Sequence, residues 1–276
     1  MPNLKIGGSP DFVHFPSEMT YLGEGALSAL KSCKTVTLPA ALTVIGDHAF
    51  QKFTNLEQIV IPDSVKVIGE CAFMGCTALK SIVISSSAAE IGECAFMGCT
   101  ALTSIVIPDS VTRIGGFAFG QCTALTSVEI SGSAAEIGEC AFVGCTALTS
   151  IDIPDSVTLL GDSAFMGCTA LTDAVLPCSL TKPGKRVFRG CTSLAQVTIP
   201  NSIEVLDAED FLLTPWLEQL VQQADRPKGL CRLQGLAADR DTGQREGDRR
   251  MRLQGLHRAE KRCDIKQRGG DRRPCL

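Results

Sequence analysis

Leu102–Ala124 reads "LTSIVIPDSVTRIGGFAFGQCTA", and variants of this 23-residue unit recur along most of the chain. Four residue types keep the step of 23 in a fixed phase, which predicts a repeat architecture rather than an ordinary globular domain. The phenylalanines are Phe50, Phe73, Phe96, Phe119, Phe142, Phe165, Phe188 and Phe211. The other three series are Gly46, Gly69, Gly92, Gly115, Gly138, Gly161 and Gly184; Leu56, Leu79, Leu102, Leu125, Leu148, Leu171 and Leu194; and Cys76, Cys99, Cys122, Cys145, Cys168 and Cys191.

The first part of the unit alternates apolar and outward-facing residues, as a short strand does. Ile105 and Ile107 are expected to point inward, and Ser104 and Val106 to point outward. Pro108 lacks the N–H that a strand ladder needs, so the strand is expected to end there. The "PDS" that begins with this proline is typical of a turn.

The second part of the unit returns the chain to the next strand. Gly115 is expected to take a backbone conformation that other residues avoid. Residues 117–122, "FAFGQC", are expected to form one or two helical or 3₁₀ turns. No unit can bury its apolar side alone, so the units are expected to stack into a solenoid whose stability is nearly a sum over neighbouring coils.

The repeat register also indicates how the chain is divided. Residues 11–33 form a degenerate first coil with Leu27 in the phenylalanine position, and "TPWLEQLVQQA" at 214–224 is expected to form a capping helix. We therefore predict a solenoid of about nine coils over residues 11–224, after an N-terminal extension of residues 1–10. The remaining stretch, 225–276, is rich in Arg, Gly, Asp and Gln and is expected to be a disordered basic tail.

Charge and cysteine content bear on location and partners. Residues 1–217 carry 11 Lys and Arg against 21 Asp and Glu, whereas residues 218–276 carry 15 against 9, so an acidic body is joined to a basic tail. The first residues lack the apolar core of a secretion signal, and no apolar run is long enough to span a membrane. With 14 cysteines, these features favour free thiols and a cytoplasmic location, with the cell surface as the alternative.

The motifs "IPDSV", "IG-x-x-AF" and "CTAL" resemble the BspA-like, or Treponema pallidum type, leucine-rich repeats, and they cover about residues 11–217. The resemblance implies an α/β right-handed solenoid with a parallel sheet on its concave face and short helical or 3₁₀ turns on its convex side. Members of this family include bacterial cell-surface proteins that bind host matrix proteins. Leucine-rich repeats in general are protein-binding scaffolds, which is an inference from fold alone.

The cysteines fall into two series that call for different interpretations. Coils spaced about 4.8 Å apart place the regular ladder, Cys76 onward, outside the Cβ separation of about 3.5–4.5 Å that a disulfide needs, so these residues are expected to be core. The second series, Cys71, Cys94 and Cys140, shares its position with His48 and Arg186, which predicts a location near the surface. A zinc site needs four converging ligands, and no further ligand is expected beside Cys71 and Cys94.

The outward-facing strand residues form the candidate binding site. They change from aliphatic to acidic along the predicted concave face and are flanked by serines. The site comprises Val83, Ser104, Val106, Ser127, Glu129, Ser150, Asp152 and Asp173. Glu129 and Asp152 have the spacing of paired catalytic carboxylates, but the columns contain no aromatic residue for a sugar, so an acidic spot for a basic partner is favoured.

The remaining motifs favour no catalytic chemistry. Asp63, Asp109 and Asp155 lie two coils apart, about 10 Å, which is too far to share a calcium ion, so they are interpreted as turn residues. We expect no cofactor, no metal and no nucleic-acid partner. The hypothesis is a monomeric, non-enzymatic scaffold that binds a protein, and the alternative is a surface adhesin of the BspA-like type.

Overall fold

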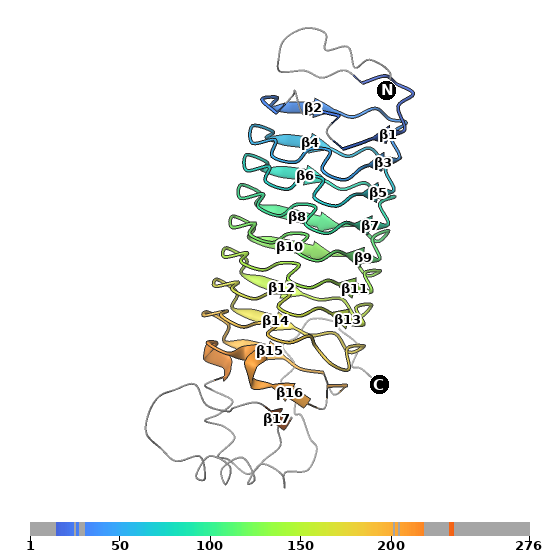
Figure 1. Cartoon of the computed structure of the whole chain (residues 1–276). Helices are drawn as coiled ribbons and strands as arrows, with labels where there is room; N and C mark the ends of the chain where they lie inside the picture. The colour runs from blue at the N-terminus through green and yellow to red at the C-terminus, as the bar shows by residue number, and fades with distance from the viewer. Residues whose placement is uncertain are drawn as a thin grey trace.

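The computed structural model describes residues 15–24, 26–27, 31–200, 202–203, 205–217 and 232–234. Over these residues the chain winds into a parallel β-solenoid whose strands stack one above the other (Figure 1). Paired residues on neighbouring coils are 23 positions apart, as in Ser104 with Ser127 and Thr35 with Gln58. The predicted repeat solenoid is therefore confirmed.

One set of strands forms the side of the solenoid that carries the candidate binding site. Each strand exposes its first residue and turns the next one inward, which is buried except in β10 and β15, where it is half-buried. In β8 the alternation is that predicted, with Ser104 and Val106 exposed and Ile105 and Ile107 buried. These strands are β2 (Thr35–Thr37), β4 (Gln58–Val60), β6 (Ser81–Val83), β8 (Ser104–Ile107), β10 (Ser127–Ile130), β12 (Ser150–Asp152), β14 (Asp173–Val175) and β15 (Gln196–Thr198). Their outer surface is called the strand face below.

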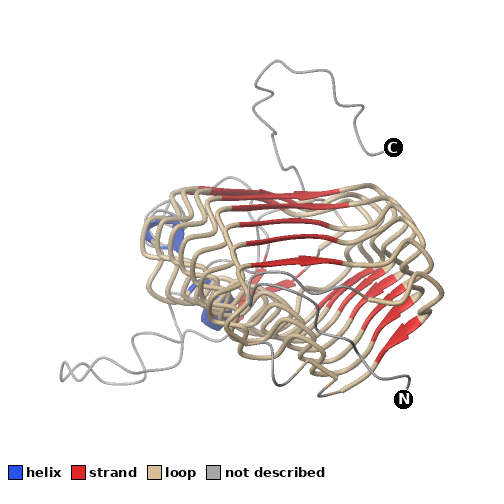
Figure 2. Ribbon diagram, turned by 90° about the horizontal axis from the view of Figure 1, so that it is seen from above, coloured by secondary structure: helices blue, strands red, loops and turns tan. Residues whose placement is uncertain are grey.

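A second sheet, which the sequence reasoning did not foresee, lies on a separate side of the solenoid (Figure 2). It is continuous over seven coils, and each coil contributes only two residues. Its strands are β1 (Tyr21–Leu22), β3 (Val44–Ile45), β5 (Val67–Ile68), β7 (Glu90–Ile91), β9 (Arg113–Ile114), β11 (Glu136–Ile137) and β13 (Leu159–Leu160). The turn that follows each longer strand from β2 to β12 leads the chain into this second sheet, with proline at its start except at Ser85 and Ser131.

The repeated glycine follows each short strand, and its role differs from the one predicted. Gly115 does not have a left-handed backbone; instead, an added Cβ would lie 2.6 Å from the carbonyl carbon of Gly92 and 2.7 Å from the backbone nitrogen of Glu93. Such distances are far below van der Waals contact. Glycine is needed here because two coils approach each other backbone to backbone.

The left-handed conformation belongs to the returning segments, which alternate two kinds of hydrogen bond. The N–H of Phe73 donates to the carbonyl of Ala95 on the next coil at 2.7 Å, whereas the N–H of Ala72 donates within its own coil to Gly69 at 3.4 Å. These segments are turns with 3₁₀-type bonds, as expected. Positive φ recurs two residues before each repeat phenylalanine from Phe50 to Phe188 and two residues after each from Phe50 to Phe211. The non-glycine cases are His48, Lys52, Cys71, Cys94, Phe117, Gln121, Cys140, Ser163, Arg186 and Leu213.

The core runs along the axis as columns of identical residues. The phenylalanine rings from Phe50 to Phe211 stack in sequence, with centroids 4.9 to 5.7 Å apart. Each ring is completely or almost completely buried, which contributes about 2–3 kcal/mol per ring. Leu27 is fully buried as well and belongs to the same core cluster, and its place in the phenylalanine column of the first coil stays a prediction.

The C-terminal coil departs from the repeat. β16 (Val205–Asp207) leads into the 3₁₀ helix η2 (Ala208–Phe211), and residues 215–217 are helical at the start of the predicted capping helix. Trp216 packs against Phe211 with ring centroids 4.5 Å apart. Within the predicted tail, β17 (Arg232–Gln234) pairs with β16. The rest of that tail lies outside the described residues, as do the remainder of the capping helix and the whole N-terminal extension. No helix in the described ranges has the length and apolar character of a membrane span.

Candidate functional site

The strand face carries a column of exposed valines. Val60, Val83 and Val106 occupy the same position on successive strands and expose 66%, 61% and 55% of their surface. These side chains point away from the buried core, and more than half of the surface of each is in water. An exposed apolar strip of this kind is typical of a protein-interaction surface.

The valine column continues into acidic residues towards the C-terminal end. Glu129 is paired in register with Val106, and both Glu129 and Asp152 are exposed. In the adjoining column Asp173 is paired with Ser150 and accepts a hydrogen bond from the Thr172 hydroxyl at 2.9 Å. The strand face is therefore apolar at one end and acidic at the other.

All eight residues of the predicted site lie on this one face. The four serine and aspartate residues of the first column, Ser104, Ser127, Ser150 and Asp173, begin their strands and are exposed. The other four, Val83, Val106, Glu129 and Asp152, stand two positions further along and are exposed too. The arrangement assumed in the sequence analysis is thus present, and its binding role stays a prediction.

The second sheet, which is formed by the short strands, carries a row of alternating positive and negative side chains. Arg113 forms ion pairs with Glu90 at 2.6 Å and with Glu136 at 3.3 Å, on the coils before and after it. These hydrogen bonds and charges raise the pKa of Arg113. The row joins coils to one another, so we assign it to the framework.

The regular cysteine ladder is buried framework as predicted. All six residues from Cys76 to Cys191 are completely buried, and each thiol donates to the phenylalanine carbonyl of the preceding coil, as Cys122 does to Phe96 at 3.2 Å. Burial raises the pKa of Cys122 to about 12, so this thiol stays protonated and unreactive at neutral pH. Cys178 is disulfide-bonded, so the expectation of free thiols throughout is wrong for this residue.

The second cysteine series differs from expectation in its burial. Cys71 and Cys140 are buried, exposing 7% and 8% of their surface, whereas Phe117 and Arg186 in the same position are exposed. All these residues share the left-handed backbone. The predicted near-surface location is therefore wrong for Cys71 and Cys140, whereas Cys94 and Ser163 are half-buried and Phe117 and Arg186 are exposed.

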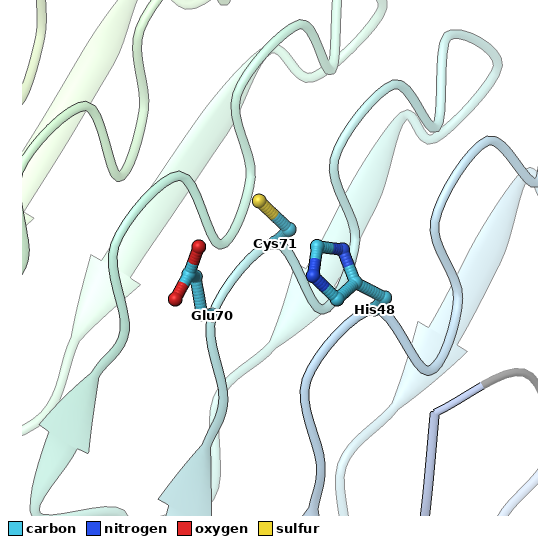
Figure 3. A group of neighbouring side chains, drawn as sticks. All are labelled: His48, Glu70 and Cys71. Atoms are coloured by element: carbon cyan, nitrogen blue, oxygen red, sulfur yellow. The ribbon is translucent and has the colours of Figure 1, made fainter.

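His48, Glu70 and Cys71 form a cluster that the sequence reasoning missed (Figure 3). One ring nitrogen of His48, a carboxylate oxygen of Glu70 and the Cys71 sulfur all lie within 4.8 Å of one another. The expectation of no further ligand type beside Cys71 is therefore wrong. The signal was in the register, because His48 precedes Cys71 by one repeat and so lies on the adjacent coil.

The turn aspartates act as links between coils. Asp109 accepts a hydrogen bond from the backbone N–H of Gly132 at 3.1 Å, and Asp155 accepts one from the N–H of Cys178 at 2.8 Å. Asp63 accepts a hydrogen bond from the Ser86 hydroxyl at 3.2 Å. This placement supports the interpretation of these residues as turn residues.

With the repeat geometry in place, comparison with known proteins assigns the chain to a family. The family described as "BspA type Leucine rich repeat region" matches residues 9–101 and 89–214, with six copies. The chain belongs to the BspA-type leucine-rich-repeat family. The predicted resemblance is confirmed over nearly the whole solenoid.

Solved structures of bacterial proteins share this fold. A leucine-rich-repeat protein of Eubacterium ventriosum is 26% identical with a TM-score of 0.58 over 72% of this chain and 63% of its own length. The Treponema pallidum leucine-rich-repeat protein is 23% identical with a TM-score of 0.55 over 85% of this chain and 97% of its own. A leucine-rich cell surface protein of Faecalibacterium prausnitzii is 34% identical, with a TM-score of 0.45 and 68% of this chain covered.

The BspA-type chain described here is shorter than two of these proteins. It spans 59% of the length of the Faecalibacterium protein and 63% of that of the Eubacterium protein. Among curated proteins, no match to the chain was found. The comparisons thus support the fold and the family, and a function has to be argued from the surface.

Proposed function

We propose that this BspA-type repeat protein is a non-enzymatic scaffold that binds a protein partner on its strand face. The observation that carries the proposal is the exposed column Val60, Val83 and Val106, which leads into Glu129 and Asp152. Valines with more than half of their surface in water gain free energy when a partner covers them, at about 25 cal/mol per Å².

The acidic end of the face indicates the character of the partner. A complementary surface would place an aliphatic or aromatic strip over the valines and Lys or Arg over Glu129, Asp152 and Asp173. Apolar contact would supply most of the affinity, and the charges would set the direction in which the partner lies. Association is then expected to slow as salt rises, because charges at a rim mainly steer the encounter.

The experiment compares variants of the full chain in affinity capture followed by mass spectrometry and then in calorimetric titration with the captured protein. Val106→Arg and Asp152→Lys are expected to weaken binding at least tenfold, which corresponds to about 1.4 kcal/mol. Leu159→Arg is the matched control, because Leu159 is also an exposed aliphatic residue, with 50% of its surface in water, but lies on the short-strand sheet. Equal binding by all three variants would refute the strand face as the site.

A second candidate function is adhesion at a cell surface, which membership of the BspA-type family favours. The proposal of a binding face is common to both candidates, so location distinguishes them. Antibody labelling of intact cells would detect the chain if it is displayed on the surface. Labelling that appears only after the cells are opened would leave the scaffold function and exclude the adhesin.

A further inference from the structure

The left-handed position two residues before the phenylalanine forms a row along the solenoid wall. In three successive coils this row holds His48, Cys71 and Cys94, with φ values of 55°, 52° and 52°. Each coil from His48 to Arg186 has this backbone conformation, so the conformation belongs to the repeat; what is particular to these three coils is the chemistry of the side chains.

Glu70 adds a third donor, beside His48 and Cys71, from the residue immediately before Cys71. Its carboxylate, the Cys71 sulfur and a ring nitrogen of His48 lie within 4.8 Å of one another, and Glu70 is exposed and able to turn towards the other two (Figure 3). Zinc bonds of about 2.0–2.3 Å place tetrahedral ligands roughly 3.3–3.8 Å apart. A contraction of about 1 Å, within the reach of side-chain rotation, would therefore bring the three donors to the separations of a zinc site.

Figure 3 shows which ring nitrogen of His48 takes part. Nε2 faces Glu70, whereas Nδ1, which is buried and forms no hydrogen bond in the described structure, lies on the other side of the ring. A cation at the cluster would therefore be bound through Nε2, and the proton would stay on Nδ1.

We propose that His48, Glu70 and Cys71 bind a thiophilic divalent cation of the zinc class, with water in the fourth coordination position. Thiolate and imidazole donors suit zinc and disfavour magnesium and calcium, which take oxygen ligands. The site is separate from the strand face, because its residues lie in the returning segments beside the second sheet.

Metal binding at this site has to displace the proton from the Cys71 thiol. Without metal, burial and, after it, the neighbouring Cys94 and Glu70 raise the pKa of Cys71 to about 11. A bound cation reverses this balance because a coordinated thiol is deprotonated. The cation would tie two successive coils together, because its ligands come from residues 48 and 70–71.

The chain supplies its own comparison for this site. Cys140 occupies the same position two coils after Cys94, is buried like Cys71, and follows Glu139 as Cys71 follows Glu70. Its neighbours in the row are Phe117 and Ser163, which offer no imidazole and no second thiol. Cys140 is therefore a matched control with the same backbone but without the ligand set.

The test is a Co²⁺ titration of the reduced full chain, followed by absorption from thiolate-to-cobalt charge transfer, with Zn²⁺ and then Mg²⁺ as competitors. The wild-type chain is expected to develop the band and to lose it when Zn²⁺, but not Mg²⁺, is added. Glu70→Gln, an exposed substitution, is expected to weaken Co²⁺ binding at least tenfold. Unfolded variants are recognised by circular dichroism before titration.

His48→Ser and Cys71→Ser are expected to remove the charge-transfer band, and Cys140→Ser is expected to retain it. Serine is compatible with this position, because Ser163 occupies it with a φ of 57°. A wild-type chain without the band, displacement by Mg²⁺ as readily as by Zn²⁺, or equal loss in Cys140→Ser and Cys71→Ser would each overturn the proposal. Retention of the band by His48→Ser would overturn it as well.

Discussion

At the scale of the residue, substitution by alanine distinguishes three kinds of glycine in this solenoid: those at a close backbone approach, those with a left-handed backbone, and those with neither requirement. Gly115→Ala is expected to destabilise by about 2–3 kcal/mol, because its Cβ would overlap the Gly92 backbone at 2.6 Å. Gly98→Ala meets no atom closer than 3.8 Å but has a φ of +73°, which costs about 1 kcal/mol. Urea unfolding of each variant measures these differences.

Gly132→Ala is the control for both, because an added Cβ meets nothing within 4 Å and the backbone is not left-handed. Its free energy of unfolding is expected to change by less than about 0.5 kcal/mol. If Gly98→Ala proved more costly than Gly115→Ala, the assignment of close approach to one glycine and backbone conformation to the other would be wrong.

Asp210 makes the last coil sensitive to pH. It is buried, and burial is the largest cause that raises its pKa to about 6; the nearby charges of Asp207 and Asp162 act in the same direction, against the hydrogen bond from the Arg186 N–H. Since the unfolded pKa is about 3.9, folding favours the protonated form. Its stabilising contribution is present below about pH 4 and is lost as pH rises through 6.

Asp210→Asn mimics the protonated carboxyl. The change that it causes in the free energy of unfolding should therefore be more favourable at pH 8 than at pH 4, by about 2 kcal/mol. Thermal unfolding at the two pH values measures this difference. The control is Glu209→Gln, which removes the same charge from an exposed neighbour and should show little pH dependence. A wild-type chain that gains stability over the variant as pH rises would contradict the assigned pKa.

The residue scale also shows where sequence reasoning stops. Phenylalanine, leucine and cysteine could be assigned to the core because periodicity alone reports burial. Gly115 was predicted to have an unusual backbone conformation, but it is required by the close approach of two backbones. The sequence cannot distinguish these two causes, because both require glycine. His48 was placed in the same repeat position as Cys71, but the register alone does not show that the donor atoms of His48 and Glu70 lie within 4.8 Å of the Cys71 sulfur.

At the scale of the element, the second sheet was not predicted because its strands have two residues, too few for an alternating pattern to show. The longer strands were predicted because four residues and a terminal proline suffice. Register explains what holds the short strands: each coil places its pair beside equivalent pairs, as Glu136 lies beside Arg113 and Leu159. A strand this short exists only because its neighbours do.

The charge row Glu90–Arg113–Glu136 on this sheet is expected to contribute little. Arg113→Ala should cost about 0.5–1 kcal/mol in the free energy of unfolding at low salt, because all three side chains are substantially exposed and water screens their attraction. In 1 M NaCl, where the screening length is about 3 Å, most of this difference should disappear. A cost that is unchanged in high salt would mean that packing by the arginine stem, not charge, is responsible.

At the scale of the whole molecule, each coil contacts mainly the coils before and after it, so stability should be close to a sum of coil and interface contributions. Deletion of Leu148–Ala170 removes one 23-residue coil and rejoins the chain in register. Phe142 then stacks on Phe188, and Gly138 meets Gly184, which preserves both the ring column and the close backbone approach. The shortened chain is expected to fold as a solenoid.

The measurable consequence is a cooperative urea transition whose m-value is lower by about a tenth, because m scales with the surface exposed on unfolding. Deletion of Leu148–Thr158 is the control: about half a coil is lost, the phenylalanine and glycine columns fall out of phase, and cooperative unfolding should be abolished. If the two deletions behaved alike, the coils could not be the units of stability. The nearest-neighbour description would then fail, because it predicts that deletion of a whole repeat preserves cooperative unfolding whereas deletion of half a repeat abolishes it.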